Sequence, residues 1–400
     1  MQTDEILNKN EYSPNDICHL LKLSEQNDLQ KLQNRANEIL FKNIGNDVFI
    51  RGLIEFSNYC ICDCNYCGIR KSNSKISRYQ LTFDEIIDCV NLAKKMNFVS
   101  VVLQSGERND EKFIDYVLEI IKVIKEKTKS EKLPNGFGIT LSIGEQTEEN
   151  YKKLFDAGAA RFLLRIETTN QNIFEKIHSK SEKLHHKDIS FDKRLKSISI
   201  LQKIGFQVGT GVMIGLPEQT IEDLANDIIF FKENDIDMLG MGAYIPHKNT
   251  PLGQNYFTEN NFHSSSLRAF EKCVAISGNS EEIATPKRLA MTDSNYRLQL
   301  SLNMIAVARI VLKDVNIAST TALETLSQNG RILGLQYGAN VVMPQFTPNS
   351  YKANYLLYDK KPLVDETETV LKNFTVACEN IGRKVAFGKS GTSQHFVNRK

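Results

Sequence analysis

The chain has 400 residues, and its 50 Lys and Arg against 48 Asp and Glu give a formal net charge of +2. This length allows one large α/β domain or two or three small ones, with a core that needs no disulfide or metal to hold it. The balanced charge predicts binding neither to nucleic acid nor to an anionic membrane. Four of the eight Cys fall between residues 60 and 67. This clustering indicates a metal site in a reducing compartment rather than a disulfide framework.

The sequence contains no segment that predicts membrane insertion or export. Its longest apolar runs, such as 98–103, have the length of a strand, whereas a spanning helix needs roughly 20 apolar residues. The first residues, MQTDEILNKNEYS, have neither an apolar core nor an excess of Arg. We therefore expect a cytoplasmic enzyme, and an organelle matrix stays open as an alternative.

Segments typical of strands and of helices alternate along the chain. We expect strands at 48–56, 98–104, 138–142, 161–168, 207–214, 237–244, 315–321 and 339–344, several of them apolar throughout, as in parallel sheets. Capping residues mark helix starts at Thr82, Thr147 and Thr220. Eight such units predict a (β/α)8 TIM barrel with its functional groups at the C-terminal ends of the strands. An open doubly wound sheet is the alternative, although no GxGxxG follows the first strand.

Three segments fall outside the expected barrel at 47–360. Residues 1–46 are expected to form an N-terminal helical extension packed outside the barrel. The stretch 253–300 is too long for one connection and is expected to be an insertion before the seventh strand. Residues 361–400 are expected to form a C-terminal helix and a basic tail.

A cysteine motif follows the first predicted strand. The segment 57–73 has the sequence SNYCICDCNYCGIRKSN, in which Cys60, Cys64 and Cys67 form a CxxxCxxC. Thiolates bind iron–sulfur clusters and zinc. A closed zinc site needs four ligands, and Cys62 is awkwardly spaced to be the fourth, so we interpret it as a bystander. Three thiolates on a four-iron cluster leave one iron open, as catalysis by a metal requires.

Polar groups also follow the later strands. Ser105, Gly106 and Glu107 follow the second, where the Gly allows a ligand close to the backbone. Ser142 ends the third strand, and Arg194 begins a helix after the fourth. On the fourth strand Arg165 and Glu167 share one face, so these charges either pair with each other or bind a ligand.

In this order the motifs resemble those of the radical S-adenosylmethionine (SAM) superfamily. Longer strings, among them IEFSNYC, VVLQSGE, RFLLRIETTN, GVMIGLPEQT and IASTTALET, resemble the HydE family of FeFe-hydrogenase maturases. This resemblance covers about 4–360 apart from 253–300. It implies a (β/α)8 barrel, the cofactor SAM, and a 4Fe-4S cluster on Cys60, Cys64 and Cys67.

The resemblance also implies roles for residues at the strand ends. Cofactor contacts are implied for Tyr66, Ser105, Gly106, Glu107, Ser142, Glu167 and Arg194. A substrate cavity is implied for Arg165, Thr320, Thr321, Met343 and Tyr355. Simple packing is the alternative for Tyr66 and for the two threonines, which are common in strands.

The family resemblance implies reductive cleavage of SAM. The resulting 5'-deoxyadenosyl radical then acts on a sulfur-containing organometallic iron carbonyl/cyanide precursor in H-cluster assembly. Implied partners are other hydrogenase maturases, in transient contact, and an electron donor such as ferredoxin or flavodoxin. Many family members carry a second cluster on C-terminal Cys residues, whereas this chain has only Cys378 there, so we predict one cluster. Two further departures are Ile166, where relatives commonly have His, and an extra stretch at 180–188.

Other functions stay open. A methylornithine synthase-like lysine mutase shares the Cys motif and much of the cofactor apparatus. Biotin synthase is disfavoured because it needs further barrel Cys, and the predicted strands two to eight contain none. A non-catalytic zinc-binding scaffold is the alternative from another class.

Overall fold

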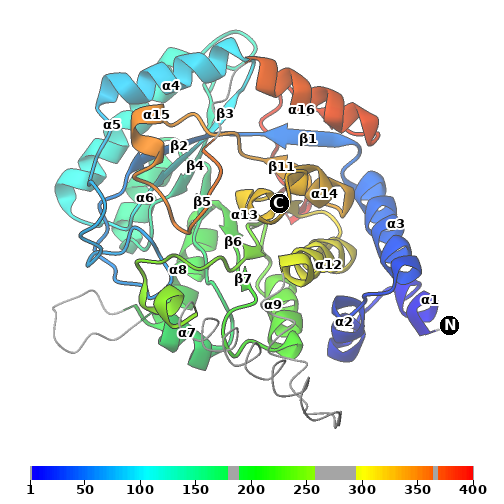
Figure 1. Cartoon of the computed structure of the whole chain (residues 1–400). Coiled ribbons are helices and arrows are strands. Elements are labelled where there is room, and N and C mark those ends of the chain that lie inside the picture. The colour runs from blue at the N-terminus through cyan, green and yellow to red at the C-terminus, as the bar shows by residue number, and fades with distance from the viewer. Residues whose placement is uncertain (1, 179–188, 257–293, 364–367, 400) are drawn as a thin grey trace.

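The structure, a computed structural model, describes residues 2–178, 189–256, 294–363 and 368–399. Short parallel strands stand at its centre with helices around them (Figure 1). Seven strands form one sheet in the order β10-β8-β6-β5-β4-β3-β2. In chain order they are β2 (Gly52–Ser57), β3 (Ser100–Ser105), β4 (Gly138–Ser142), β5 (Arg161–Leu163), β6 (Gln207–Thr210), β8 (Met238–Leu239) and β10 (Asn316–Ile317).

The strand order follows the chain order without the reversal that defines a doubly wound sheet. Every predicted strand overlaps an observed one, so the expected alternating α/β fold with a parallel sheet is confirmed. Several strands are shorter than predicted. Between β6 and its continuation, for example, a Cβ atom at Gly211 would meet the Gly240 carbonyl oxygen at 2.1 Å, which shows how closely the two backbones approach.

A second set of pairings involves β11 (Val341–Val342) and β1 (Asp47–Ile50). Its preceding residue Asn340 accepts a hydrogen bond from the Phe49 N–H at 2.8 Å. The Val341 carbonyl accepts another from the Ser319 N–H, just after β10, at 2.9 Å. β11 therefore contacts both β1 and the β10 end of the seven-stranded sheet. The remaining strands are β1 (Asp47–Ile50), β7 (Met213–Ile214), β9 (Gly242–Ala243), β11 (Val341–Val342) and β12 (Lys384–Val385).

Helices follow the strands and cover the sheet (Figure 1). The capping box predicted at Thr82 is present in full, as is one at Thr220, and the Thr147 side chain also caps its helix. The helices are α4 (Phe83–Lys95), α5 (Glu111–Thr128), α6 (Glu148–Asp156), α7 (Gln171–Ile177), α8 (Phe191–Ile204), α9 (Ile221–Glu233), α12 (Ser294–Leu312), α13 (Thr321–Leu326), α14 (Gly330–Gln336) and α15 (Asn349–Lys352).

The two faces of β2 have different partners, and this decides which side chains reach the interior. Phe56 stacks on Phe113 of α5 with ring centres 6.0 Å apart, so it points outward to the helices. Because side chains alternate along a strand, Glu55 points to the opposite side. The site described below is built from such inward-facing positions.

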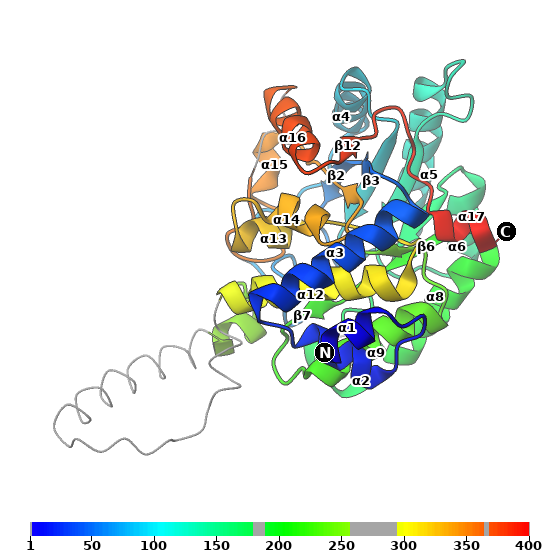
Figure 2. The same cartoon turned by 90° about the vertical axis from the view of Figure 1, so that its right-hand side faces the viewer.

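The first residues form α1 (Gln2–Leu7), α2 (Pro14–Leu21) and α3 (Gln26–Asn43). α2 packs against α9 and α3 against α12, so these helices lie on the outer layer (Figure 2). In the part of the chain that the structure describes, no helix is both long and apolar enough to cross a membrane.

Two predicted irregular segments fall largely outside the described residues. Of the expected insertion at 253–300, residues 257–293 are not described, and residues 294–300 form the first turns of α12. The extra stretch at 180–188 also lies outside the described residues. The side chains of 300–312 on α12 are buried without exception, so this helix belongs to the core.

The C-terminal segment is more structured than a helix and a basic tail. After α16 (Glu368–Asn380), β12 pairs in parallel with β1. The last helix, α17 (Gln394–Arg399), is bound to the loops around Asp235 and Asp314. The ring nitrogens of His395 lie 2.7 Å from Asp235 Oδ1 and 2.9 Å from Asp314 Oδ1. The sequence contained no signal for this clamp, because its acidic partners lie far away in the chain.

The His395 clamp predicts a pH-dependent contribution to stability. Hydrogen bonds to Asp314 and Asp235 raise the pKa of His395 from 6.5 to about 9. A raised pKa in the folded state stabilises the protein fully below the unfolded pKa, and this contribution is lost as the pH rises through about 9. We expect His395→Gln to lower the free energy of unfolding by about 1 kcal/mol at pH 6 and by much less at pH 10. Chemical denaturation of both proteins at each pH measures this, and an equal loss at both values would contradict it.

Candidate functional site

The three predicted cluster ligands lie on the loop that follows β2, which we call the cluster loop (residues 58–69). Cys60, Cys64 and Cys67 are free thiols and are only partly exposed. Arg78 fixes both ends of the loop, because its guanidinium donates to the carbonyl oxygens of Asn58 at 2.6 Å and Ile69 at 2.8 Å. The cluster loop is therefore held through its backbone carbonyls at the C-terminal end of β2.

The turn after β3 packs directly on the cluster loop. A Cβ atom at Gly106 would come within 2.4 Å of the Tyr59 carbonyl oxygen and 2.8 Å of Cys60 Cβ. The Ile61 N–H donates to the Glu107 carbonyl oxygen at 2.9 Å. Only glycine fits at position 106, so the turn and the loop take up one fixed relative position.

The chemistry of the thiols fits a bound cluster. Burial and neighbouring thiols raise the pKa of Cys67 to about 12 and the pKa of Cys64 well above its usual range. The thiolate forms of Cys64 and Cys67 therefore need the positive charge that bound iron supplies. In the described ranges no three His, Cys, Asp or Glu side chains converge on a single-ion site. The thiolates of a four-iron cluster each bind a different iron and do not converge in that way.

Cys62 is buried next to the predicted ligand Cys60. It is 3% exposed, and its backbone N–H donates to Cys60 Sγ at 3.4 Å. A hydrogen bond between the two side chains lowers the pKa of Cys60 and raises the pKa of Cys62. This contact places Cys62 beside the sulfur of Cys60, a predicted ligand, and hydrogen bonds to ligand sulfurs tune a cluster. The role of Cys62 as a non-ligand stays a prediction.

Arg194 is buried among carboxylates at the ends of β3 and β4. Its Nε donates to Glu145 Oε1 at 2.6 Å, and its Nη2 lies 4.0 Å from Glu107 Oε2. A second donor of the guanidinium reaches the Arg165 carbonyl oxygen. The structure thus brings together Arg194 and Glu107, two of the predicted cofactor residues. Glu145 was not predicted.

Arg165 and Glu167 form the internal pair that the sequence left open. Arg165 Nε lies 3.0 Å from each Glu167 carboxylate oxygen, and Arg165 Nη2 lies 2.9 Å from Oε2. Glu167 has φ 67°, a left-handed conformation that is costly for a side chain of this kind. Such outliers gather at functional sites. The Arg165 side chain is still 30% exposed, so the pair does not exclude contact with a ligand.

Tyr66 reaches from the cluster loop to the same pair. Its hydroxyl lies 3.5 Å from Glu167 Oε1 and 3.4 Å from His178 Nε2. Burial raises the pKa of Tyr66, and the Glu167 carboxylate adds to this effect, so the hydroxyl keeps its proton. His178 was not predicted, because it is a single residue at the end of a short helix.

The two predicted serines lie at adjacent strand ends. The Ser105 hydroxyl donates to the Gly106 carbonyl oxygen at 2.7 Å. Ser142 stands opposite Gln104 in the register of β4 with β3. The predicted cofactor residues therefore come from the consecutive strands β2 to β5 and from α8, on one edge of the sheet.

Several of the predicted substrate residues lie at the ends of the later strands. The Thr320 hydroxyl donates to the Met241 carbonyl oxygen at 3.2 Å, next to Gly240, whose carbonyl accepts from Arg165. The Thr321 hydroxyl lies 2.7 Å from the hydroxyl of Tyr358, which was not predicted. Met343, which follows β11 directly, is partly exposed.

Tyr355 belongs to a buried polar group that sequence reasoning missed. Its hydroxyl accepts from Gln104 Nε2 at 3.4 Å. The ammonium of Lys361 lies 5.3 Å from the centre of its ring and forms an ion pair with Glu55, which is 1% exposed. Glu55 carried a signal, since it is a charge at an inward position of an apolar strand. Lys361 carried none, because it follows no regular element.

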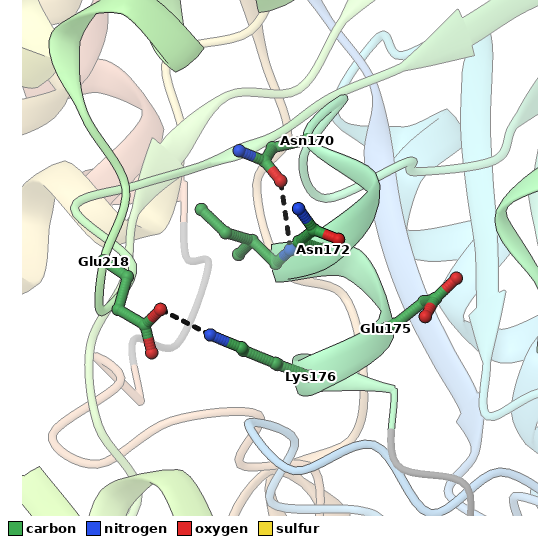
Figure 3. A pocket seen from close by; sticks show the side chains of 6 residues that line it. Asn170, Asn172, Glu175, Lys176 and Glu218 are labelled. Atoms are coloured by element: carbon green, nitrogen blue, oxygen red, sulfur yellow. Dashed lines mark hydrogen bonds and ion pairs between the residues drawn. The ribbon is translucent and has the colours of Figure 1, made fainter.

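A hollow lies elsewhere, beside α7 (Figure 3). It measures about 540 Å³ and is lined by Asn170, Asn172, Ile173, Glu175, Lys176 and Glu218. Lys176 and Glu218 form an exposed ion pair across it at 2.5 Å. None of the predicted site residues lines this hollow, so it is separate from the site above.

Comparisons with known proteins identify the superfamily and the fold. The model of the Radical SAM superfamily matches residues 54–231, which include the cluster loop, Glu167 and Arg194. The crystal structure of methylornithine synthase (PylB) superposes with a TM-score of 0.72 at 23% identity, covering 96% of this chain and 97% of that one, which supports the fold alone. The fold and the cluster loop are those of a radical SAM protein.

Several curated relatives span nearly the whole chain. The [FeFe] hydrogenase maturase subunit HydE of Thermotoga maritima is 36% identical over 394 residues, covering 98% of this chain and 97% of its own. The 3-methylornithine synthase of Methanosarcina barkeri is 24% identical over 388 residues, covering 96% and 93%. The chain belongs to the HydE family of radical SAM proteins.

Substitution by alanine is expected to have opposite effects on the cluster at Cys62 and at Cys64. We expect Cys64→Ala to lose the cluster and with it reductive cleavage of SAM, because two thiolates cannot hold it. Cys62→Ala should keep about four irons per chain after anaerobic reconstitution, because it removes no ligand. Iron and sulfide analysis with visible absorbance measures both. A colourless Cys62→Ala protein, or full cleavage by Cys64→Ala, would overturn the ligand assignment.

Proposed function

We propose that this chain reductively cleaves SAM and uses the 5'-deoxyadenosyl radical on a sulfur-containing organometallic iron carbonyl/cyanide precursor in the assembly of the FeFe-hydrogenase H-cluster. The observation that carries the proposal is the 36% identity to a HydE maturase over 98% of the chain. The proposal is also supported by the cluster loop, which lies next to buried charged side chains at the C-terminal ends of the strands.

We also infer that the sheet closes into a (β/α)8 barrel, with β11 between β10 and β1. The bridges Ala318–Val341 and Leu53–Gln345 support this inference. A closed barrel would place Glu55, Arg165 and Tyr355 in one interior away from bulk water. Such exclusion of water protects a radical from side reactions.

In the proposed site Cys60, Cys64 and Cys67 hold one 4Fe-4S cluster. When bound, the reduced cluster and SAM supply the 5'-deoxyadenosyl radical, and this chemistry belongs to the cofactors. The chain contributes binding and orientation. Arg194 offers its guanidinium to the carboxylate of SAM, and Glu167 accepts hydrogen bonds from its ribose hydroxyls or amino group.

Further residues complete the cofactor side. Tyr66 would pack beside the adenine, and the turn Ser105-Gly106-Glu107 would accept hydrogen bonds from the amino group through its backbone carbonyls. Ser142 adds a hydroxyl at the same edge. Gly106 supports this role because the lack of a side chain lets the turn pack directly on the cluster loop.

The substrate side is proposed to consist of Arg165, Thr320, Thr321, Met343 and Tyr355. A guanidinium and hydroxyls are groups that bind anionic or polar ligands. The neighbouring carbonyls of Gly240 and Met241 already orient Arg165 and Thr320. We propose transient contact with other hydrogenase maturases and reduction by a donor such as ferredoxin or flavodoxin.

Substituting Arg165 tests the substrate side. We expect Arg165→Ala to keep the cluster, because Arg165 bonds none of the cysteines, and to lower hydrogenase activation at least tenfold. Arg35→Ala, which removes a guanidinium from the outer helix α3, is the matched control. Activity is measured by maturing apo-hydrogenase in vitro with each variant. Normal activation by Arg165→Ala would remove Arg165 from the substrate site.

Conversion of lysine distinguishes the second candidate. The 3-methylornithine synthase relative spans 96% of the chain, so the same preparations are incubated with lysine, SAM and a reductant. The proposal predicts no methylornithine. Rapid formation of methylornithine without hydrogenase activation would replace the proposed function by a lysine mutase.

A further inference from the structure

The C-terminal end of α7 is bonded to the two residues that separate the second and third cluster ligands. The Asn65 N–H donates to the Ile177 carbonyl oxygen at 2.8 Å, and Asn65 Nδ2 donates to the Lys176 carbonyl oxygen at 2.9 Å. The next residue, His178, contacts Tyr66. The end of this helix therefore supports the cluster loop along Asn65 and Tyr66.

The bonds of His178 determine which ring nitrogen carries the proton. Its Nδ1 lies 2.9 Å from the Phe174 carbonyl oxygen, and a carbonyl can only accept, so Nδ1 is protonated. Burial, at 3% exposure, and the nearby charge of Arg194 lower the pKa of His178 to about 3, so the ring is neutral. Nε2 then carries a lone pair, which faces the Tyr66 hydroxyl at 3.4 Å.

The Tyr66 hydroxyl has one proton and two possible acceptors. Glu167 Oε1 lies 3.5 Å away on one side, and His178 Nε2 lies 3.4 Å away on the other. A hydroxyl that donates to His178 leaves the Glu167 oxygen available for another donor. The two rings also pack edge to face, with centres 5.6 Å apart, which restricts rotation of the tyrosine ring.

We propose that His178 is a positioning residue, which holds Tyr66 in the orientation that binds SAM and keeps its hydroxyl proton away from Glu167. This inference rests on the proposed cofactor site. The expected ligand is the nucleoside end of SAM, because Tyr66 offers a ring face and Glu167 an acceptor beside the cluster loop. His178 itself touches neither cluster nor substrate and acts through Tyr66.

The first test compares two substitutions of His178. His178→Leu fills the site but cannot accept a hydrogen bond, whereas His178→Gln retains an acceptor. We expect His178→Leu to raise the KM for SAM about tenfold in dithionite-driven cleavage, with kcat and iron content little changed. His178→Gln should recover most of that loss. Glu175→Gln, at an exposed position of the same helix (Figure 3), is the control and should resemble the wild type.

A double substitution and a spectrum complete the test. Tyr66→Phe should raise the KM as His178→Leu does, and the two together should be no worse than either alone. Addition of SAM should change the EPR spectrum of the reduced cluster less in His178→Leu than in the wild type. An unchanged KM in His178→Leu would overturn the proposal. Loss of iron, or equal damage by His178→Gln, would show a merely structural role and overturn it as well.

The test separates this inference from the proposed function. It measures SAM cleavage directly and needs no hydrogenase. A wild-type protein that cleaves SAM but activates no hydrogenase would refute the proposed function and leave the role of His178 intact. An unchanged KM in His178→Leu, together with normal hydrogenase activation, would refute the role of His178 and leave the proposed function intact.

Discussion

The close approach of two backbones, the cluster loop and the turn after β3, is the constraint on which the rest of the site depends. Gly106 leaves no space for a side chain between them, since even a Cβ atom would lie 2.4 Å from the Tyr59 carbonyl oxygen. Glu107 in turn packs on Gly144, where a Cβ atom would meet its Cγ at 2.2 Å. The ends of three consecutive strands are thereby fixed against each other. The backbone consequently places the thiols and the carboxylates at the same end of the sheet.

Charged side chains connect α8 and the residues that follow β5 to the ends of these strands. Arg194 is bonded to Glu145 and to the Arg165 carbonyl oxygen, and Arg165 holds Glu167 in its left-handed conformation. Strain of that kind costs about 1–3 kcal/mol, and the charge-assisted bonds of the guanidinium offset it. Removing one partner of the buried Arg194–Glu145 pair would leave an uncompensated charge, at a cost of about 3–5 kcal/mol. The network is therefore pre-arranged, and binding of a ligand requires little further ordering of these side chains.

Much of this arrangement followed from local sequence signals. Apolar runs, capping residues and the spacing of Cys60, Cys64 and Cys67 predicted the alternating fold and the position of the thiol loop. The contacts that sequence reasoning missed join residues far apart in the chain, such as Lys361 with Glu55 and His395 with Asp314. No local pattern encodes them, because both partners are single charged residues in otherwise ordinary segments. The Arg165–Glu167 pair shows a further limit, since alternation placed both on one face but did not decide between an internal pair and a ligand site.

Activation of apo-FeFe-hydrogenase in a defined mixture of maturases, SAM and reductant, with and without this protein, tests the central claim most directly. The account predicts that hydrogenase activity appears only when this protein is present, and that the mixture consumes SAM and forms 5'-deoxyadenosine in parallel. Equal hydrogenase activity with and without the protein, at full cluster content and measured SAM cleavage, would contradict the assigned function.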